Sequence, residues 1–321
     1  MIAPSRVKIA GLQTAVEGGK VLLTVPIASQ YYISEAVSSN YLIMPTRQTL
    51  SKPDIQLSYL EWNQGKEPLL LLHGLADNAV VWSSLGDYLT TDYHIIAPDM
   101  RGHGDSSKPE TDYTFESAIA DLESLMDHLG WSNAHIVAHS WSGKLACIWA
   151  KQNPNRLRSL ILVDPIFIWK IPSLFKLTFP VLYRVLPFLQ AMGPFASYEQ
   201  AEQKARQLSE YQGWNSLQQQ AFEAGIEEKA DGSWGSKFTI AARDRIFTEV
   251  MRLPGLTIPI HIPTLFIQPE KGVNRQEWQL KPYKTYLKNL RISQVPGNHW
   301  AFLTQPAAFN STVKAFLNQQ R

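Results

Sequence analysis

A serine at the junction of an apolar run and a helix-like run is the first sign of chemistry in this sequence. The segment IVAHSWSGKLA places Ser140 there, with Ala138 two residues before it and Ser142 two residues after it. A tight strand-to-helix turn needs small residues at both positions because it presses their backbone against neighbouring chain, and such a turn exposes a nucleophilic serine. The alternative is a serine that only caps an ordinary helix.

Two backbone N–H groups are predicted to stabilise negative charge beside that serine. His73-Gly74-Leu75 follows the apolar run 69–72, and Trp141 begins the helix after Ser140. A loop after one strand and a helix N-terminus can both direct N–H groups at a developing oxyanion. We expect Leu75 and Trp141 to donate these bonds and His73 to hold the loop.

The best-placed general base is His299. The segment RISQVPGNHW places it after a strand-like run and a turn at Pro296-Gly297, just before the last helix. A base at a strand end can reach a nucleophile at another strand end of the same sheet. His103 and His139 lie near the proposed site in sequence and are expected to pack the loops.

The elements that must position these residues alternate in type. Strand-like runs at 69–72, 93–97, 134–138 and 160–164 are separated by helical patterns, which predicts an α/β fold with a mostly parallel central sheet and helices on both faces. The alternation stops after Pro165 and resumes at Pro263. We expect an N-terminal extension of unknown role over 1–40, a core domain over 41–164 and 256–321, and an inserted helical cap over 165–255.

Composition and net charge argue against several classes of function and location. The formal net charge is +2, and the sequence has no basic block, so we expect no nucleic-acid partner. Cys147 is the single cysteine, which rules out an internal disulfide and favours a reducing compartment. With no signal-like or bilayer-length apolar run, a cytoplasmic protein without a transmembrane segment is predicted, and the chemistry above requires neither a metal nor an organic cofactor.

The segments LLLLHG, APDMRGHGDSS, VAHSWSG, LILVDP and PGNHW, in this order and spacing, resemble the α/β-hydrolase fold superfamily, especially its serine esterases and lipases. The resemblance covers residues 41–319. It implies a cap between the sixth and seventh strands and a serine, acid, histidine triad in that chain order. Haloalkane dehalogenases and epoxide hydrolases of this fold use aspartate where this chain has Ser140, so the resemblance does not imply their chemistry.

The triad acid departs from the family pattern. Members place an aspartate after the seventh strand in a Gly-x-x-Asp turn, whereas this chain has Pro269-Glu270-Lys271-Gly272. Either Glu270 in that loop or Asp164 at the end of the sixth strand could replace it. We favour Asp164, because it keeps the chain order and leaves a buried strand beside that of Ser140.

These residues predict a serine hydrolase that cleaves a carboxylic ester with an apolar acyl or alcohol group, since the cap sequence is rich in large apolar residues. A small apolar ester is the expected partner. Hydrolysis of an amide, a thioester or a carbon–carbon bond stays open, as does a non-catalytic protein that binds a small molecule. Transient contact with a lipid surface also stays open, and the oligomeric state does not follow from the sequence.

Overall fold

The computed structural model describes residues 13–17, 20–24, 45–179, 181, 189 and 191–320, and the chain divides into compact units over Met1–Leu42 and Ile43–Arg321. In the first unit, β1 (Gln13–Glu17) and β2 (Lys20–Thr24) pair antiparallel. Most of the N-terminal extension expected over 1–40 lies outside the described residues.

The second unit contains an eight-stranded sheet in the order β12-β11-β8-β7-β5-β6-β4-β3. β4 pairs antiparallel with both of its neighbours, and the other pairs are parallel. This is the predicted mostly parallel sheet, and β3 and β4 form its antiparallel edge. The strands are β3 (Thr46–Ser51), β4 (Gln56–Asn63), β5 (Glu67–Leu72), β6 (Tyr93–Pro98), β7 (Ala134–His139), β8 (Leu157–Val163), β11 (Thr264–Lys271) and β12 (Leu290–Asn298).

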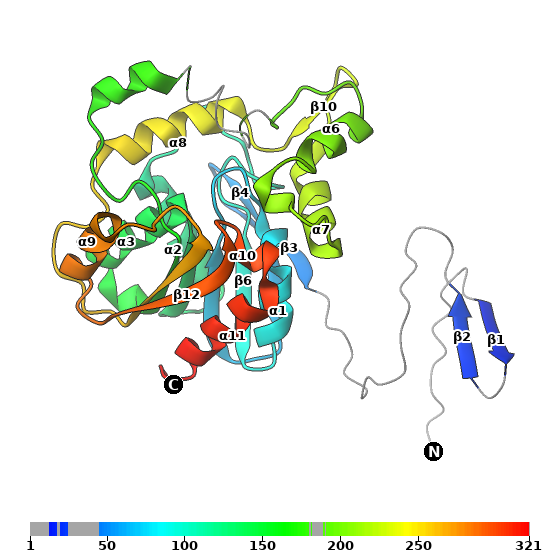
Figure 1. Cartoon of the computed structure of the whole chain (residues 1–321), viewed down its shortest axis with the longest axis horizontal. Coiled ribbons are helices and arrows are strands. Elements are labelled where there is room, and N and C mark those ends of the chain that lie inside the picture. The colour runs from blue at the N-terminus through cyan, green and yellow to red at the C-terminus, as the bar shows by residue number, and fades with distance from the viewer. Residues whose placement is uncertain are drawn as a thin grey trace. The chain divides into compact units, whose positions relative to one another are not determined.

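Helices cover both faces of this sheet (Figure 1). Strand β5 shows the reason: Leu69 and Leu71 pack with α1, α10 and α11, whereas Leu70 and Leu72 point to the opposite face and pack with α2, α3 and α9. A strand buried on both faces must be apolar at every position. The helices of the sheet domain are η1 (Ala79–Trp82), α1 (Ser83–Leu89), α2 (Phe115–His128), α3 (Trp141–Gln152), η2 (Pro154–Arg156), α9 (Glu277–Tyr286), α10 (Ala301–Thr304) and α11 (Pro306–Leu317).

The segment between β8 and β11, residues 165–255, is called the cap segment here. It combines helices with a short hairpin of β9 and β10. Its described elements are η3 (Ser173–Thr178), α6 (Tyr198–Ala205), η4 (Ser209–Tyr211), α7 (Ser216–Gly225), β9 (Ile226–Glu228), β10 (Trp234–Ser236) and α8 (Ile240–Arg252). Within the described residues, no helix combines the length and the apolar character needed to cross a membrane.

The prediction of a turn at Pro296-Gly297 is wrong. Both residues belong to β12, which stays paired with β11 as far as Asn298, opposite Lys271. A register shift between Pro269 and Lys271 absorbs the irregularity. Gly297 is required because its φ is +102° and a Cβ there would lie 3.0 Å from Gln305 and Thr304. His299 therefore follows the strand directly.

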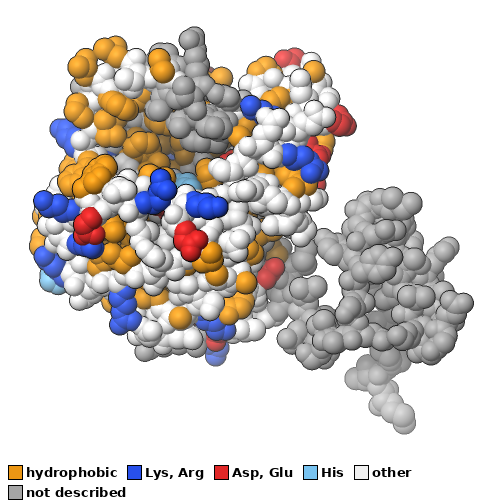
Figure 2. Space-filling model, viewed as in Figure 1, with side chains coloured by type: hydrophobic (Ala, Val, Ile, Leu, Met, Phe, Trp, Pro, Cys, Tyr) orange, Lys and Arg blue, Asp and Glu red, His pale blue; other side chains and the backbone are white. Residues whose placement is uncertain are grey.

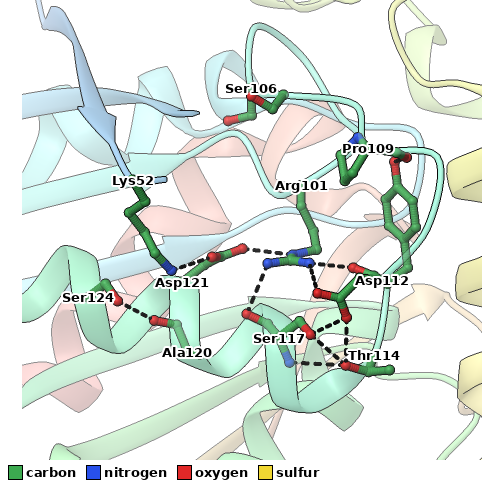
Figure 3. Close-up of polar contacts among 12 residues, drawn as sticks. Lys52, Arg101, Ser106, Pro109, Asp112, Thr114, Ser117, Ala120, Asp121 and Ser124 are labelled. Atoms are coloured by element: carbon green, nitrogen blue, oxygen red, sulfur yellow. Dashed lines mark hydrogen bonds and ion pairs between the residues drawn. The ribbon is translucent and has the colours of Figure 1, made fainter. Parts of the chain in front are cut away.

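Arg101 fastens the loop after β6 to helix α2 (Figure 3). Its side chain is 4% exposed, and Nε donates to Asp121 Oδ2 at 2.7 Å. Lys52 Nζ, from the β3–β4 turn, lies 3.0 Å from the other oxygen of the same carboxylate. Because both partners of the Arg101–Asp121 pair are buried, each depends on the other for compensation of its charge.

We therefore expect Arg101→Met to lower the free energy of unfolding by about 3 kcal/mol, because it leaves the buried Asp121 carboxylate with only Lys52. Urea denaturation measures the change. The matched control is Arg158→Met, which breaks an ion pair with Glu67 whose two side chains are 41% and 40% exposed. The control should cost at most about 1 kcal/mol, and equal losses in the two variants would contradict this account.

Candidate active site

The residues singled out in the sequence meet at one edge of the sheet. Ser140 follows β7, Asp164 follows β8, His299 follows β12, and Leu75 lies in the loop after β5. These four strands run parallel, so their carboxyl ends meet at the same edge. Ligands of open α/β sheets bind at this edge.

Ser140 occupies a strained turn. Its φ of 58° and ψ of −121° fall outside the regions that a serine ordinarily adopts, and its N–H donates to Val163 O at 3.0 Å. A Cβ on Gly143 would lie 2.5 Å from that of Pro165, so the helix after the turn needs glycine there. This geometry differs from the helix-cap alternative, in which the serine side chain would bond to the helix; Ser140 makes no such bond.

Ser142 stands where related proteins usually have glycine, and it makes a contact that glycine cannot. Its buried hydroxyl donates to His73 O at 2.6 Å. The contact joins the first turn of α3 to the loop that carries Leu75. Serine at this position therefore adds a link between the turn at Ser140 and the neighbouring loop.

A chain of two hydrogen bonds links Asp164, His299 and Ser140. His299 Nδ1 lies 2.6 Å from Asp164 Oδ2, and His299 Nε2 lies 3.0 Å from Ser140 Oγ. Because a carboxylate can only accept, Nδ1 carries the proton and Nε2 is free to accept from the serine hydroxyl. The arrangement can remove a proton from Ser140 without moving the ring.

Asp164 is fully buried and has further donors. The backbone N–H groups of Val273 and Asn274 donate to it at 2.7 and 3.1 Å, and Asn274 Nδ2 donates at 2.8 Å. Burial alone would raise the pKa of Asp164, but the His299 contact and these donors outweigh it, so the pKa lies below its usual value. Asp164 is thus held as a carboxylate. Gly272 permits this approach, since a Cβ there would lie 2.6 Å from Asp164 Oδ2.

The sequence reasoning missed Asn274. Its position in the loop after β11, where the family usually places its aspartate, was the available signal. The alternative acid, Glu270, is exposed at the end of β11 and makes no hydrogen bond with His299. The loop in which the family pattern places the acid supplies amide donors to Asp164 instead.

Leu75 and Trp141 have backbone N–H groups available beside Ser140. Neither donates to an acceptor within the described part of the chain. Trp141 is the first residue of α3, whose N-terminus carries partial positive charge. The two groups can therefore serve as oxyanion donors, which stays a prediction.

A cavity of about 690 Å³ opens onto Ser140 and His299. Its wall is mostly apolar, with Phe167, Trp169 and Phe247 from the cap segment and Trp278 from α9. Such a lining suits a small apolar ligand with few polar anchors.

Comparison with known proteins agrees with this architecture. The family model described as alpha/beta hydrolase fold matches residues 67–243. The chain belongs to the α/β-hydrolase fold family. The match spans the turn at Ser140 and most of the cap segment.

Individual relatives carry several activities in their names. A soluble epoxide hydrolase of Corynebacterium sp. (strain C12) is 34% identical over 116 residues, 36% of this chain and 39% of that protein. Lipase 3 of Moraxella sp. (strain TA144) is 37% identical over 123 residues, 38% of this chain and 39% of that protein. The chain thus spans about two fifths of the length of these relatives. A solved marine microorganism esterase is 25% identical, with a TM-score of 0.66 and coverage of 81% of this chain and 98% of that one.

The other histidines near the site are buried. His73 Nε2 accepts from Met100 N at 3.0 Å, so its Nδ1 donates to Gly74 O at 2.7 Å, and burial lowers its pKa. His103 stacks on Phe238, with ring centroids 4.3 Å apart. His139 Nε2 donates to His299 O at 3.0 Å and so fixes the backbone of the proposed base. Burial, and then the neighbouring His299, lower the pKa of His139.

Across the described residues, no three His, Cys, Asp or Glu side chains cluster as a metal site would require. The polar groups around Ser140 are instead paired with one another, as the hydrogen bonds of Asp164 and His299 show.

We expect Ser142→Ala to lower the free energy of unfolding by about 1 kcal/mol, because the buried His73 carbonyl loses its donor. Urea denaturation would measure the loss. Ser124→Ala is the matched control: its hydroxyl donates to Ala120 O on the solvent side of α2 and should matter little. If both variants are as stable as the wild type, the Ser142 link contributes nothing.

Proposed function

We propose that this chain is a serine hydrolase that cleaves a carboxylic ester with an apolar acyl or alcohol group. The observation that carries the proposal is the position of the His299 ring, 2.6 Å from Asp164 and 3.0 Å from Ser140. A serine hydroxyl becomes a nucleophile when a base with a fixed tautomer can take its proton.

In the proposed first half-reaction, Ser140 Oγ attacks the ester carbonyl carbon while its proton moves to His299 Nε2. The Leu75 and Trp141 amides hold the resulting oxyanion. As the carbon–oxygen bond to the alcohol breaks, the same proton passes to the leaving alcohol. Water then attacks the acyl-enzyme with His299 as base, which releases the acid and restores Ser140. Asp164 stabilises the imidazolium that forms in both halves.

Ester hydrolysis is favoured over epoxide hydrolysis by the residue at the nucleophile turn. Attack by Ser140 would give an acyl-enzyme that water can hydrolyse. By contrast, the epoxide hydrolases and haloalkane dehalogenases of the family that this sequence resembles have an aspartate at this position. The apolar cavity supports a substrate with an alkyl or aromatic group. The same triad would serve an amide or a thioester. The ester is preferred over the amide because an alcohol leaves a tetrahedral intermediate more readily than an amine does.

Three variants test the mechanism with p-nitrophenyl esters of graded acyl length. We expect kcat to fall at least about 10⁴-fold in Ser140→Ala and Asp164→Asn, since they remove the nucleophile and the group that fixes the His299 tautomer. Glu270→Gln should stay within about twofold, because Glu270 is exposed.

A steep loss in Glu270→Gln with none in Asp164→Asn would reverse the assignment of the acid. Labelling by a fluorophosphonate probe provides the second readout, because it requires an activated Ser140. A wild-type protein that hydrolyses no ester and resists the probe would favour the non-catalytic binding protein instead.

The proposal keeps the division into a core domain, 41–164 and 256–321, and a cap, 165–255, and it places the enzyme in the cytoplasm. Cys147 is buried and unpaired, as expected of a reducing compartment. Cell fractionation with an antibody tests the location, and recovery of the protein outside the cytoplasm would contradict it.

Transient contact with a lipid surface is part of the proposal. Figure 2 shows hydrophobic side chains gathered over the part of the molecule that contains α8 and α9. In η3 of the cap segment, Leu174 and Leu177 are 73% and 76% exposed. Exposed apolar side chains grouped near a cavity that binds apolar ligands are typical of such contact.

We expect Leu174→Asp/Leu177→Asp to weaken co-sedimentation with phosphatidylcholine vesicles several-fold, since burying a carboxylate in lipid is costly. Hydrolysis of a short, fully dissolved p-nitrophenyl ester should be unchanged. Ile258→Asp, which alters a 52% exposed apolar residue outside the cap segment and away from the cavity, is the control. Equal vesicle binding by the double variant and the wild type would remove the lipid contact from the proposal.

A further inference from the structure

Glu210 differs from the other buried acids of the described residues. It is 8% exposed and lies in η4, in the wall of the cavity that contains Ser140. Each of the other buried acids pairs with a cationic or imidazole side chain: Asp99 with Arg47, Asp121 with Arg101, Asp164 with His299 and Glu249 with Arg252. Within the described chain, the Glu210 carboxyl has no such partner.

The surroundings of Glu210 favour its neutral form. Burial, and then the charge of Asp77 in the loop after β5, raise the pKa of Glu210 to about 8. Tyr211, the next residue in η4, is partly buried, and burial together with the charges of Glu210 and Asp77 raises its pKa. Among the described residues no cationic side chain pairs with Glu210, and Asp77 lies 3.4 Å from the ring of His139, whose own pKa is lowered by burial. At neutral pH the carboxyl therefore carries its proton and can donate a hydrogen bond into the cavity.

The turn that carries Glu210 is fastened beside the proposed base. Asn298 Nδ2 donates to Ser209 O at 2.6 Å, and Asn298 Oδ1 accepts from Trp300 N at 2.9 Å. Asn298 and Trp300 are the two residues that flank His299. In the proposed mechanism His299 gives its proton to the leaving alcohol, so the alcohol part of the substrate lies on this side of the cavity.

We propose that Glu210 is a specificity-determining residue that donates a hydrogen bond to an acceptor oxygen in the alcohol part of the ester. The inference rests on the proposed ester hydrolysis and deepens it: the preferred substrates are esters of alcohols that bear a second oxygen as an ether, carbonyl or hydroxyl. An alkyl group in the same place would leave the acid unpaired in an apolar cavity, which penalises the wrong substrate.

Two esters of equal shape test this inference. Butyl hexanoate and 2-methoxyethyl hexanoate differ by one CH₂ replaced by an ether oxygen, which can only accept. We expect the wild type at pH 6.5 to favour the methoxyethyl ester roughly three- to tenfold in kcat/KM, measured by titration of the released acid.

The variants distinguish an effect of the hydrogen-bond donor at position 210 from an effect of side-chain size. Glu210→Gln keeps a donor and should keep the preference, whereas Glu210→Met should bring the ratio close to one while still hydrolysing butyl hexanoate, which shows that it is folded. Gln207→Met makes a similar change at an exposed residue that also lines the cavity, and it should leave the ratio unchanged.

The pH dependence of the ratio is a second readout. The wild-type preference should disappear between pH 7 and pH 9, because a carboxyl whose pKa is raised to about 8 loses its donating proton in this range. The Glu210→Gln ratio should stay constant. Since the ratio compares two substrates of one enzyme, the titration of the triad cancels.

Other outcomes would overturn the inference. A wild-type ratio of one with both esters hydrolysed, or an unchanged preference in Glu210→Met, would show that Glu210 does not contact the alcohol, while ester hydrolysis itself would stand. A strong preference for the choline ester of hexanoate, lost in Glu210→Gln, would show that Glu210 acts as a carboxylate that binds a cation. Absence of hydrolysis of every ester would refute the proposed function, and the inference with it.

Discussion

The hydrogen bond between Asp164 and His299 is the interaction on which the arrangement of the candidate site depends. A fully buried carboxylate is costly unless donors surround it, and here they come from His299 after β12 and from Val273 and Asn274 after β11. One carboxylate thus connects the ends of three neighbouring strands. The same bond sets the His299 tautomer and leaves Nε2 facing Ser140.

The nucleophile turn shows how a strained conformation is maintained by its neighbours. Ser140 has a positive φ, and an unfavourable backbone conformation persists only where the surrounding packing requires it. Gly143 fits against Pro165, and the Ser142 hydroxyl bonds to His73 O. Two glycines are therefore not required at this turn: residues of small volume suffice, and the Ser142 hydroxyl adds a link to the loop after β5.

The cap segment is attached to the sheet domain on two sides of the cavity. Lys144, buried in α3, donates to Trp169 O at 3.1 Å and to Val250 O at 2.5 Å, and burial lowers its pKa to about 7. On the other side, Ser209 O accepts from Asn298. Because both attachments are hydrogen bonds to cap backbone, they fix the course of the segment and leave its side chains free to shape the cavity. Glu210 is placed by the second attachment.

The sequence by itself determined the order of strands and helices, the family, and the placement of Ser140 and His299 at strand ends, because each depends on local periodicity or a short motif. Which carboxylate lies against His299, that of Asp164 or that of Glu270, was not a local property: it depends on the pairing of β11 with β8, which brings the loop after β11 over Asp164. Contacts between distant segments also determine three other features. These are the continuation of β12 through Pro296, the hydrogen bonds of Asn274 to Asp164, and the lack of a cationic partner for Glu210 among the described residues. Only the tertiary structure decides them, because burial and partnership are properties of segments far apart in the chain, and the residue types alone do not specify which segments meet.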